Sequence, residues 1–295
     1  MASRVSSPLA IAEGQYSELL SNYSSSLVPS VCDCEFKHGR RYHSYHSGAY
    51  QFPNDEHEQQ RLDLCRHIFY KTLHNRLFLA PIDPSGKRIL DLGTGTGIWP
   101  IAMGDEYPAA ALIVGNDLSP IQPQWAPPSP EPDGPYDFIH YRYLCGSIRD
   151  WPRLLRQCYE HLRPGGYLEV AEPSNIMYSE DDSIGPDNKV MEMMGYLNMA
   201  RWVEEAGFRV VQEQAFKMPM GTWPKDRRLK EIGALCAINI VEGVEAFTAV
   251  PFMDVLGWTK EEVAALNAAV RADVMQKRDA HMVHDFVVVV AQKPE

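Results

Sequence analysis

The stretch "ILDLGTGTGIW", residues 89–99, decides the fold of this 295-residue chain. It opens on a strand pattern, "RILDL" from Arg88, and closes on an apolar helical pattern that begins at Ile98. Between them, Gly93, Gly95 and Gly97 occupy alternate positions. A strand that ends in glycines and leads into a helix lets a ligand approach the backbone and the helix N-terminus closely. The stretch therefore predicts a ligand-binding loop in an α/β protein.

Strand and helix patterns alternate along the rest of the chain. Strands are expected at "ALIVGND" (111–117), "YDFIHYRY" (136–143), "YLEVAE" (167–172), "RVVQEQAF" (209–216) and "HDFVVVVAQKP" (284–294). Helices are expected at residues 97–107, 150–162, 190–208, 229–247 and 259–278. This alternation predicts a parallel sheet with crossover helices packed on its faces.

The region before the glycine loop divides into two parts. Residues 1–34 are rich in serine and lack an apolar period, so we expect a flexible tail. Further along, Leu62, Cys65, Phe69 and other apolar residues recur at helical spacing before the loop. We therefore predict one domain over residues 35–295, with an N-terminal helical lid over residues 35–80.

Composition excludes several classes of protein. The formal net charge of −11 and the absence of a basic run argue against a nucleic-acid partner. We see neither a membrane-length apolar stretch nor a signal sequence, so we expect no membrane contact and a cytoplasmic protein, or a nuclear one if its role is regulatory. Cys32 and Cys34 form a C-x-C pair without a second pair at zinc spacing, so we predict no metal site.

Two aspartates restrict the kinds of ligand that the glycine loop can bind. The glycines read G-x-G-x-G, and Ile98 stands where the dinucleotide fingerprint has its third glycine, which disfavours NAD and FAD. Asp91 is a poor neighbour for a pyrophosphate but a good one for an ammonium group. Asp117, after the next strand, is placed to accept hydrogen bonds from ribose hydroxyls. Asp91 and Asp117 together favour S-adenosylmethionine as the ligand of the loop. The alternative is a glycine-rich turn that binds no ligand and only packs the helix against the strand.

Longer strings make the resemblance specific. The sequences "GNDLSPIQPQW", "YDFIHYRYLCGSIRDWPRLLRQCYEHLRPGGYLEVAE" and "GRRYHSYHSGAYQFPNDEHEQQRLDL" resemble the LaeA-like family of fungal class I methyltransferases, from about residue 35 to the C-terminus. The resemblance implies a Rossmann-like sheet flanked by helices and S-adenosylmethionine as cofactor. It also implies a role in fungal secondary metabolism, either as a tailoring enzyme with a small-molecule methyl acceptor or as a regulator with a velvet-type protein partner.

Carried over by position, the resemblance implies four groups of site residues. Those at the methionine end of the cofactor are Asp91, Gly93, Gly95 and Gly97. Those that hold the ribose are Asp117 and Leu118. Those that face the sulfonium and the methyl acceptor are His140 and Tyr141. Those that close over the cofactor are Tyr50 and Arg61.

The chain departs from the family pattern after Trp125. The run "APPSPEPDGP", residues 126–135, stands where the family has an outer strand. Proline donates no backbone hydrogen bond and cannot pair as an internal strand. We therefore expect a class I methyltransferase sheet that lacks one edge strand.

The sequence leaves two questions open. His140 stands where a general base could act, but methyl transfer from a sulfonium depends mainly on proximity and orientation, so a role in shaping the site is an equal alternative. At the level of the whole protein, the alternatives to a small-molecule methyltransferase are a LaeA-like regulator that acts through protein partners and a truncated or degenerate fold without methyl transfer.

Overall fold

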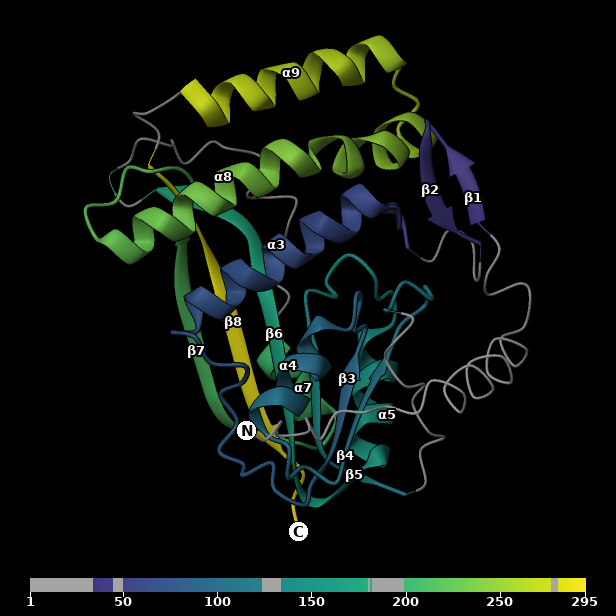
Figure 1. Cartoon of the computed structure of the whole chain (residues 1–295), viewed down its shortest axis with the longest axis vertical. Coiled ribbons are helices and arrows are strands. Elements are labelled where there is room, and N and C mark those ends of the chain that lie inside the picture. Colours follow the sequence, from purple (N-terminus) through teal and green to yellow (C-terminus); the bar gives the residue numbers. More distant parts are fainter. Residues whose placement is uncertain (1–33, 45–49, 124–133, 180, 182–198, 277–280) are drawn as a thin grey trace, which may run out of the picture.

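A computed structural model describes residues 34–44, 50–123, 134–179, 181, 199–276 and 281–295 of the chain. Almost all of the predicted tail, residues 1–34, lies outside the described residues, and the predicted domain boundaries stay a prediction. The centre of the molecule is an α/β arrangement (Figure 1), as the sequence predicts.

The central sheet contains six strands among the described residues, in the order β4-β3-β5-β6-β8-β7. Their bounds are β3 Arg88–Leu92, β4 Leu112–Asn116, β5 Tyr136–Arg142, β6 Leu162–Ser179, β7 Arg209–Pro219 and β8 Met282–Gln292. Strands β3 to β6 pair in parallel, whereas β8 runs antiparallel to both β6 and β7, so the sheet is mixed and the prediction of a parallel sheet is wrong at β8. The carboxyl ends of the parallel strands thus lie together at one end of the sheet, where the glycine loop follows β3.

Helices cover both faces of this sheet. They are α3 Glu56–Thr72, α4 Ile98–Glu106, α5 Trp151–His161, α7 Met199–Glu205, α8 Arg227–Thr248 and α9 Lys260–Gln276, with a π-helix, η1, at Ala249–Val255. Apolar residues of α3, α4 and α8 form one core against the sheet, and those of α5 and α7 form a second core on the other face. Figure 1 shows α9 lying outside α8, as an outer layer over α3.

The lid differs from the prediction at its beginning. The sequence predicts a helical lid over residues 35–80, but an antiparallel hairpin, β1 Cys34–Lys37 and β2 Arg40–His43, precedes α3. The two turn residues, His38 and Gly39, both have positive φ, 51° and 79°. This is the backbone that a two-residue hairpin turn needs, since its twist matches that of the strands. The His-Gly pair was the available signal.

Strand β4 lies at one edge of the sheet within the described residues. The proline-rich run that stands in place of the family's outer strand falls largely in residues 124–133, outside the described residues. Of the helix predicted at 190–208, the described part is α7, and residues 190–198 lie outside. The other predicted elements are present at the expected places, and β6 and β7 extend beyond their predicted ends.

One helical stretch corrects the expectation about membrane-length segments. Arg227–Val255, which joins α8 and η1, has the length and mean hydropathy (1.5) that a membrane-crossing helix needs. Half of its most apolar window is buried inside the protein. Because α8 packs against both α3 and α9, its apolar residues have partners within the fold.

A buried carboxyl group fixes the chain between α3 and β3. Glu169, in the middle of β6, has no exposed surface, and its Oε2 accepts hydrogen bonds from the backbone N–H groups of Leu79 and Ala80, both at 2.7 Å. Burial raises the pKa of Glu169 to about 7, against the opposing effect of these amides and of Arg142.

The protonation of Glu169 should make folding stability depend on pH. The native carboxyl keeps its proton up to about pH 7, whereas the unfolded one releases it near 4.5. The free energy of unfolding should therefore fall as pH rises between these values. Glu169→Gln keeps an oxygen acceptor and removes the titration, so we expect it to stabilise the protein by about 1–3 kcal/mol at pH 8 and much less at pH 5.

Urea unfolding between pH 5 and pH 8 checks this expectation. Glu160→Gln, at an exposed position on α5, is the matched control and should keep the wild-type pH profile. A Glu169→Gln protein whose stability changes with pH as steeply as the wild type would contradict the assignment.

Candidate active site

The glycine loop between β3 and α4 depends on three left-handed backbone conformations. Gly93, Gly95 and Gly97 have φ values of 64°, 57° and 78°. A methyl group added to Gly93 would lie 2.4 Å from Leu144 Cδ2, so the Leu144 side chain would have to move, and the left-handed backbone remains the main reason for a glycine there. A methyl group on Gly95 would meet nothing within 4 Å. The loop thus packs tightly at Gly93 and leaves open space at Gly95.

Two side chains from the segment after β4 hold this loop in place. Asp117 accepts hydrogen bonds from the backbone N–H of Gly95 (2.8 Å) and from that of Ser119 (2.9 Å). The Gln122 side-chain amide donates to the backbone oxygens of Gly95 (2.7 Å) and Ser119 (3.0 Å). Burial raises the pKa of Asp117, and the two amide N–H groups oppose that shift. Since a carboxylate oxygen can accept more than one hydrogen bond, Asp117 keeps acceptor capacity for a ligand.

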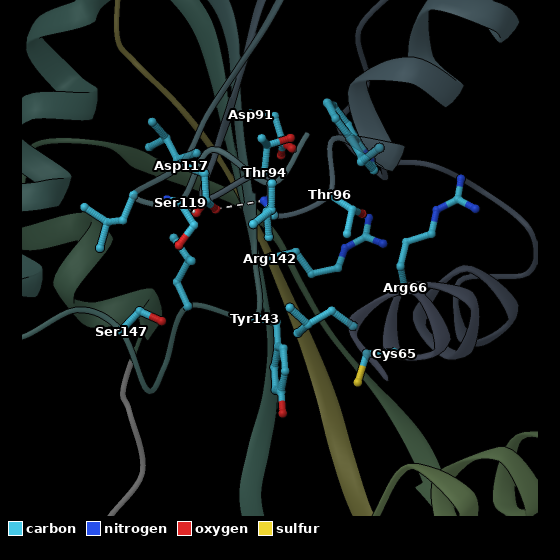
Figure 2. Close-up of a pocket in the computed structure, with 18 of the residues that line it drawn as sticks. Cys65, Arg66, Asp91, Thr94, Thr96, Asp117, Ser119, Arg142, Tyr143 and Ser147 are labelled. Carbon is cyan, nitrogen blue, oxygen red and sulfur yellow. Dashed lines mark hydrogen bonds between the residues drawn. The ribbon is translucent and has the colours of Figure 1, made fainter. Parts of the chain in front are cut away.

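A pocket of about 380 Å³ opens beside the loop, at the carboxyl ends of β3, β4 and β5. Figure 2 shows its two sides, with Asp117 and Ser119 on one and Cys65 and Arg66 of α3 on the other. Its volume lies in the range of small-molecule sites, and this edge of a parallel sheet is where such ligands bind.

The pocket residues fit S-adenosylmethionine. Asp117 offers carboxylate oxygens to ribose hydroxyls, and Asp91 places a carboxylate where an ammonium group can approach. Leu118, Leu144 and Ile148 line the pocket with apolar side chains that suit an adenine ring. The open space at Gly95 lets a ligand approach the loop backbone.

A buried chain of polar groups lies on the floor of the pocket. His140 Nδ1 is 2.7 Å from Asp91 Oδ1, and Arg142 Nη2 is 3.3 Å from His140 Nε2. The imidazole stacks on Trp99 with ring centres 4.0 Å apart. An ionised carboxylate only accepts and a guanidinium only donates, which assigns the proton to Nδ1 and the lone pair to Nε2. Burial lowers the pKa of His140, although Asp91 opposes the shift.

The hydrogen-bonded series of Asp91, His140 and Arg142 distinguishes between the two roles left open for His140. The histidine is neutral with both ring nitrogens engaged, one as donor and one as acceptor. Its contacts fix the orientation of Asp91 and Arg142, which both line the pocket. The geometry therefore favours a positioning role for His140 over that of a general base.

The expectation that Tyr141 faces the methyl acceptor is wrong. Successive side chains of a strand point to opposite faces, so the pocket side of β5 carries His140 and Arg142. Tyr141 has no exposed surface and lies in the core beneath α5, with its hydroxyl 3.5 Å from Met199 Sδ. Tyr143, just after β5, lines the pocket and has a φ of 61°, an uncommon backbone for a bulky residue.

Arg61 and Gly97 also differ from their predicted places. Arg61 is 3% exposed and lies behind the pocket wall, where Nη2 donates to Glu58 Oε1 at 2.6 Å and Nη1 to Asn239 Oδ1 at 2.9 Å. It joins α3 to α8 instead of closing over a cofactor. Gly97 is the N-cap of α4 and does not contact the pocket, so its left-handed backbone serves the start of that helix.

The remaining predicted site residues do meet at the pocket. They are Tyr50, Asp91, Gly93, Gly95, Asp117, Leu118 and His140. Their predicted contacts with a cofactor stay predictions, because the structure shows only their positions.

Among the residues of this region that sequence reasoning missed, four bear on its chemistry: Arg66, Gln122, Arg142 and Tyr143. The strand alternation from His140 could have identified Arg142, and the position of Gln122 in the "SPIQP" string marked it as special without revealing its contact. The helical period of α3 placed Arg66 only at the edge of the apolar face. The backbone of Tyr143 had no sequence signal.

The chain is similar to known methyltransferases and to a regulator of secondary metabolism. A family described as "Methyltransferase domain" matches residues 64–213. Methyltransferase pytC of Aspergillus terreus is 56% identical over 92% of this chain and 91% of its own length. Secondary metabolism regulator LAE1 of Cochliobolus heterostrophus is 32% identical over 91% of this chain and 97% of its own. The solved structure of phosphoethanolamine N-methyltransferase 2 of Haemonchus contortus is 16% identical to this chain, with a TM-score of 0.42. The match covers 97% of this chain and 75% of that protein's chain.

The assignment of the His140 ring proton to Nδ1 can be measured directly. We expect the ¹⁵N spectrum of His140 to show the neutral Nδ1–H form at pH 6.5, where an ordinary histidine is about half protonated. The His140→Gln protein identifies the signal by its loss, and exposed His67 is a reference in the same sample. A protonated Nε2 at pH 6.5, in either a neutral or a charged ring, would contradict the positioning role.

Proposed function

This chain belongs to the methyltransferase domain family and to its LaeA-like members, and from that membership we propose that it methylates a small molecule of fungal secondary metabolism. The predicted enzyme class, an S-adenosylmethionine-dependent methyltransferase, agrees with the family match and with the 56% identity to Methyltransferase pytC. The proposal goes beyond these findings in what it says about the methyl acceptor, a small molecule.

The hydrogen bond between Asp117 and the glycine loop is the observation that carries this proposal. It fixes the Gly95 backbone and the carboxylate in one arrangement beside the pocket, at 2.8 Å. A donor whose ribose lies against Asp117 would extend its amino-acid end toward Asp91, which is 4% exposed and oriented by His140. The pocket thereby holds the donor in a single orientation.

When bound, S-adenosylmethionine would supply the methyl group of its sulfonium to an oxygen, nitrogen or carbon atom of the acceptor, and the breaking of the carbon–sulfur bond would release S-adenosylhomocysteine as the neutral thioether. The protein contributes by holding the two reactants in that alignment, because orientation alone lowers the barrier by several kcal/mol. Leu62 and Phe69 of α3 and Tyr143 form an apolar wall of the pocket, in which the Phe69 and Tyr143 ring centres lie 5.6 Å apart. This wall suits a compact, largely apolar acceptor.

The similarity to LAE1, a secondary metabolism regulator, supports a second candidate, a regulatory role. The velvet-type protein partner of that candidate is what the resemblance to LaeA-like proteins implies. In either case we propose that the chain works without nucleic-acid or membrane contact. Its location would be cytoplasmic for the tailoring enzyme and nuclear for the regulator.

Transfer of a labelled methyl group tests the proposal. With [methyl-³H]S-adenosylmethionine and a fungal culture extract, we expect label in a new small-molecule product that chromatography separates from the unreacted donor. Asp117→Ala should reduce the rate at least tenfold, because it removes the ribose acceptor and loosens the loop. Asp83→Ala is the matched control, since Asp83 also accepts a backbone N–H (Ser85, 3.0 Å) but lies before β3 and outside the pocket.

Label found only in protein would favour the regulatory candidate over a small-molecule acceptor. An absence of transfer to either fraction by the folded wild-type protein would contradict the methyltransferase proposal and favour either a regulator that acts only through protein partners or a degenerate fold.

A further inference from the structure

Two arginines face the pocket without an assigned role. Arg66 comes from α3 and Arg142 is the last residue of β5, and both line the cavity. In Figure 2 the Arg142 side chain extends from the sheet toward the α3 side of the pocket, where Arg66 lies. The two charges are close enough that Arg66 contributes to a lowered pKa of Arg142, about 10, for which burial is the main cause.

The hydrogen-bonding capacity of these arginines is largely unused. Arg66 makes no hydrogen bond or ion pair with any described residue; its guanidinium carbon lies 5.5 Å from the centre of the Tyr70 ring, and its Nε is buried without a partner. Arg142 donates from Nη2 to the backbone oxygen of Leu77 at 2.9 Å, and its Nε is likewise buried without a partner in the described part of the chain. Buried donors without acceptors are costly, and in a pocket an acceptor atom of a ligand or a water can remove that cost.

None of the nearby acidic groups is hydrogen-bonded to either guanidinium, although Glu169 Oε1 is also buried without a hydrogen-bond partner in the described part of the chain. Glu58 pairs with Arg61 at 2.6 Å, and Asp63 accepts a hydrogen bond from Thr96 at 2.7 Å. Asp91 accepts from His140. Glu169 attracts Arg142 but uses its Oε2 for two backbone amides. Two positive charges therefore meet in one pocket without a carboxylate bonded to either guanidinium.

We propose that Arg66 and Arg142 form a carboxylate-binding subsite of the pocket. The inference rests on the proposed function for its choice of ligand. The carboxylate belongs either to the methionine end of the cofactor or to an acidic acceptor. A planar guanidinium with free N–H groups matches the two oxygens of a carboxylate.

The placement of the two arginines agrees with both sources. Arg142 is joined to Asp91 through His140, so an amino acid with its ammonium group at Asp91 would carry its carboxylate toward the arginines. Arg66 also lies beside the apolar wall of Leu62 and Phe69, where an aromatic or aliphatic acid would place its body.

Calorimetry on the full chain separates the two sources. The first arm compares S-adenosylhomocysteine with its decarboxylated analogue, S-adenosyl-3-thiopropylamine. The second arm compares 2-naphthoate with neutral 2-naphthalenemethanol, on protein saturated with S-adenosylhomocysteine. The test variant is Arg66→Gln, which removes no hydrogen bond or ion pair to a described residue.

Arg88→Gln is the matched control. Arg88 is partly buried beside Tyr136 and also has unpartnered nitrogens, but it lies at the opposite end of β3, outside the pocket. Arg66→Lys keeps a charge without the planar fork and should retain part of the affinity. Arg142→Gln provides the second site variant, with its thermal unfolding compared with wild type.

A wild-type preference of at least tenfold for the carboxylate in either arm, reduced to less than threefold by Arg66→Gln and unchanged by Arg88→Gln, supports the subsite and identifies its source. No preference in both arms, or a preference that Arg66→Gln and Arg142→Gln leave intact, overturns it. Binding of naphthoate that depends on Arg66, by protein that does not bind S-adenosylhomocysteine, would keep the subsite and overturn the proposed function instead.

Discussion

The hydrogen bond from the Gly95 amide to Asp117 is the interaction on which the site depends. It joins the loop after β3 to the segment after β4, two parts of the chain that the parallel sheet brings to the same edge. Gln122 completes the connection by donating to the Gly95 carbonyl, so both polar groups of that peptide region are bound. The left-handed glycines could otherwise adopt many conformations. These two side chains select the one that leaves the pocket open beside Asp117.

The second constraint is electrostatic. The floor of the pocket contains the carboxylate of Asp91, a neutral imidazole and a buried guanidinium in sequence, each oriented by the next. Such a chain is stable only if its members are satisfied. The aspartate end offers a negative charge to a ligand, and the arginine end offers a positive one. A ligand with an ammonium group and a carboxylate on neighbouring atoms would meet both ends, which is why the same floor supports the proposals for the donor and for the carboxylate subsite.

The sequence predicts the fold well because local patterns and sheet topology agree. The glycine run, the strands around it and the acids at Asp91 and Asp117 follow from periodicity and spacing, and the structure places Gly93, Gly95 and both acids at the pocket. The errors arose where a side chain's direction mattered. Tyr141 points away because strands alternate, and Arg61 is turned aside by Glu58 and Asn239. The contacts of Arg66 depend on how α3 is placed over the sheet, which its own sequence does not specify.

The central claim is that the pocket beside Asp117 holds the methyl donor in one orientation. A crystal structure of the full chain with S-adenosylhomocysteine tests it most directly. We expect the ribose hydroxyls within hydrogen-bond distance of the Asp117 carboxylate, the ammonium group on the Asp91 side and the adenine against Leu118. A structure in which the ligand binds elsewhere, or in which Asp117 leaves Gly95 and the ribose contacts neither, would contradict the account.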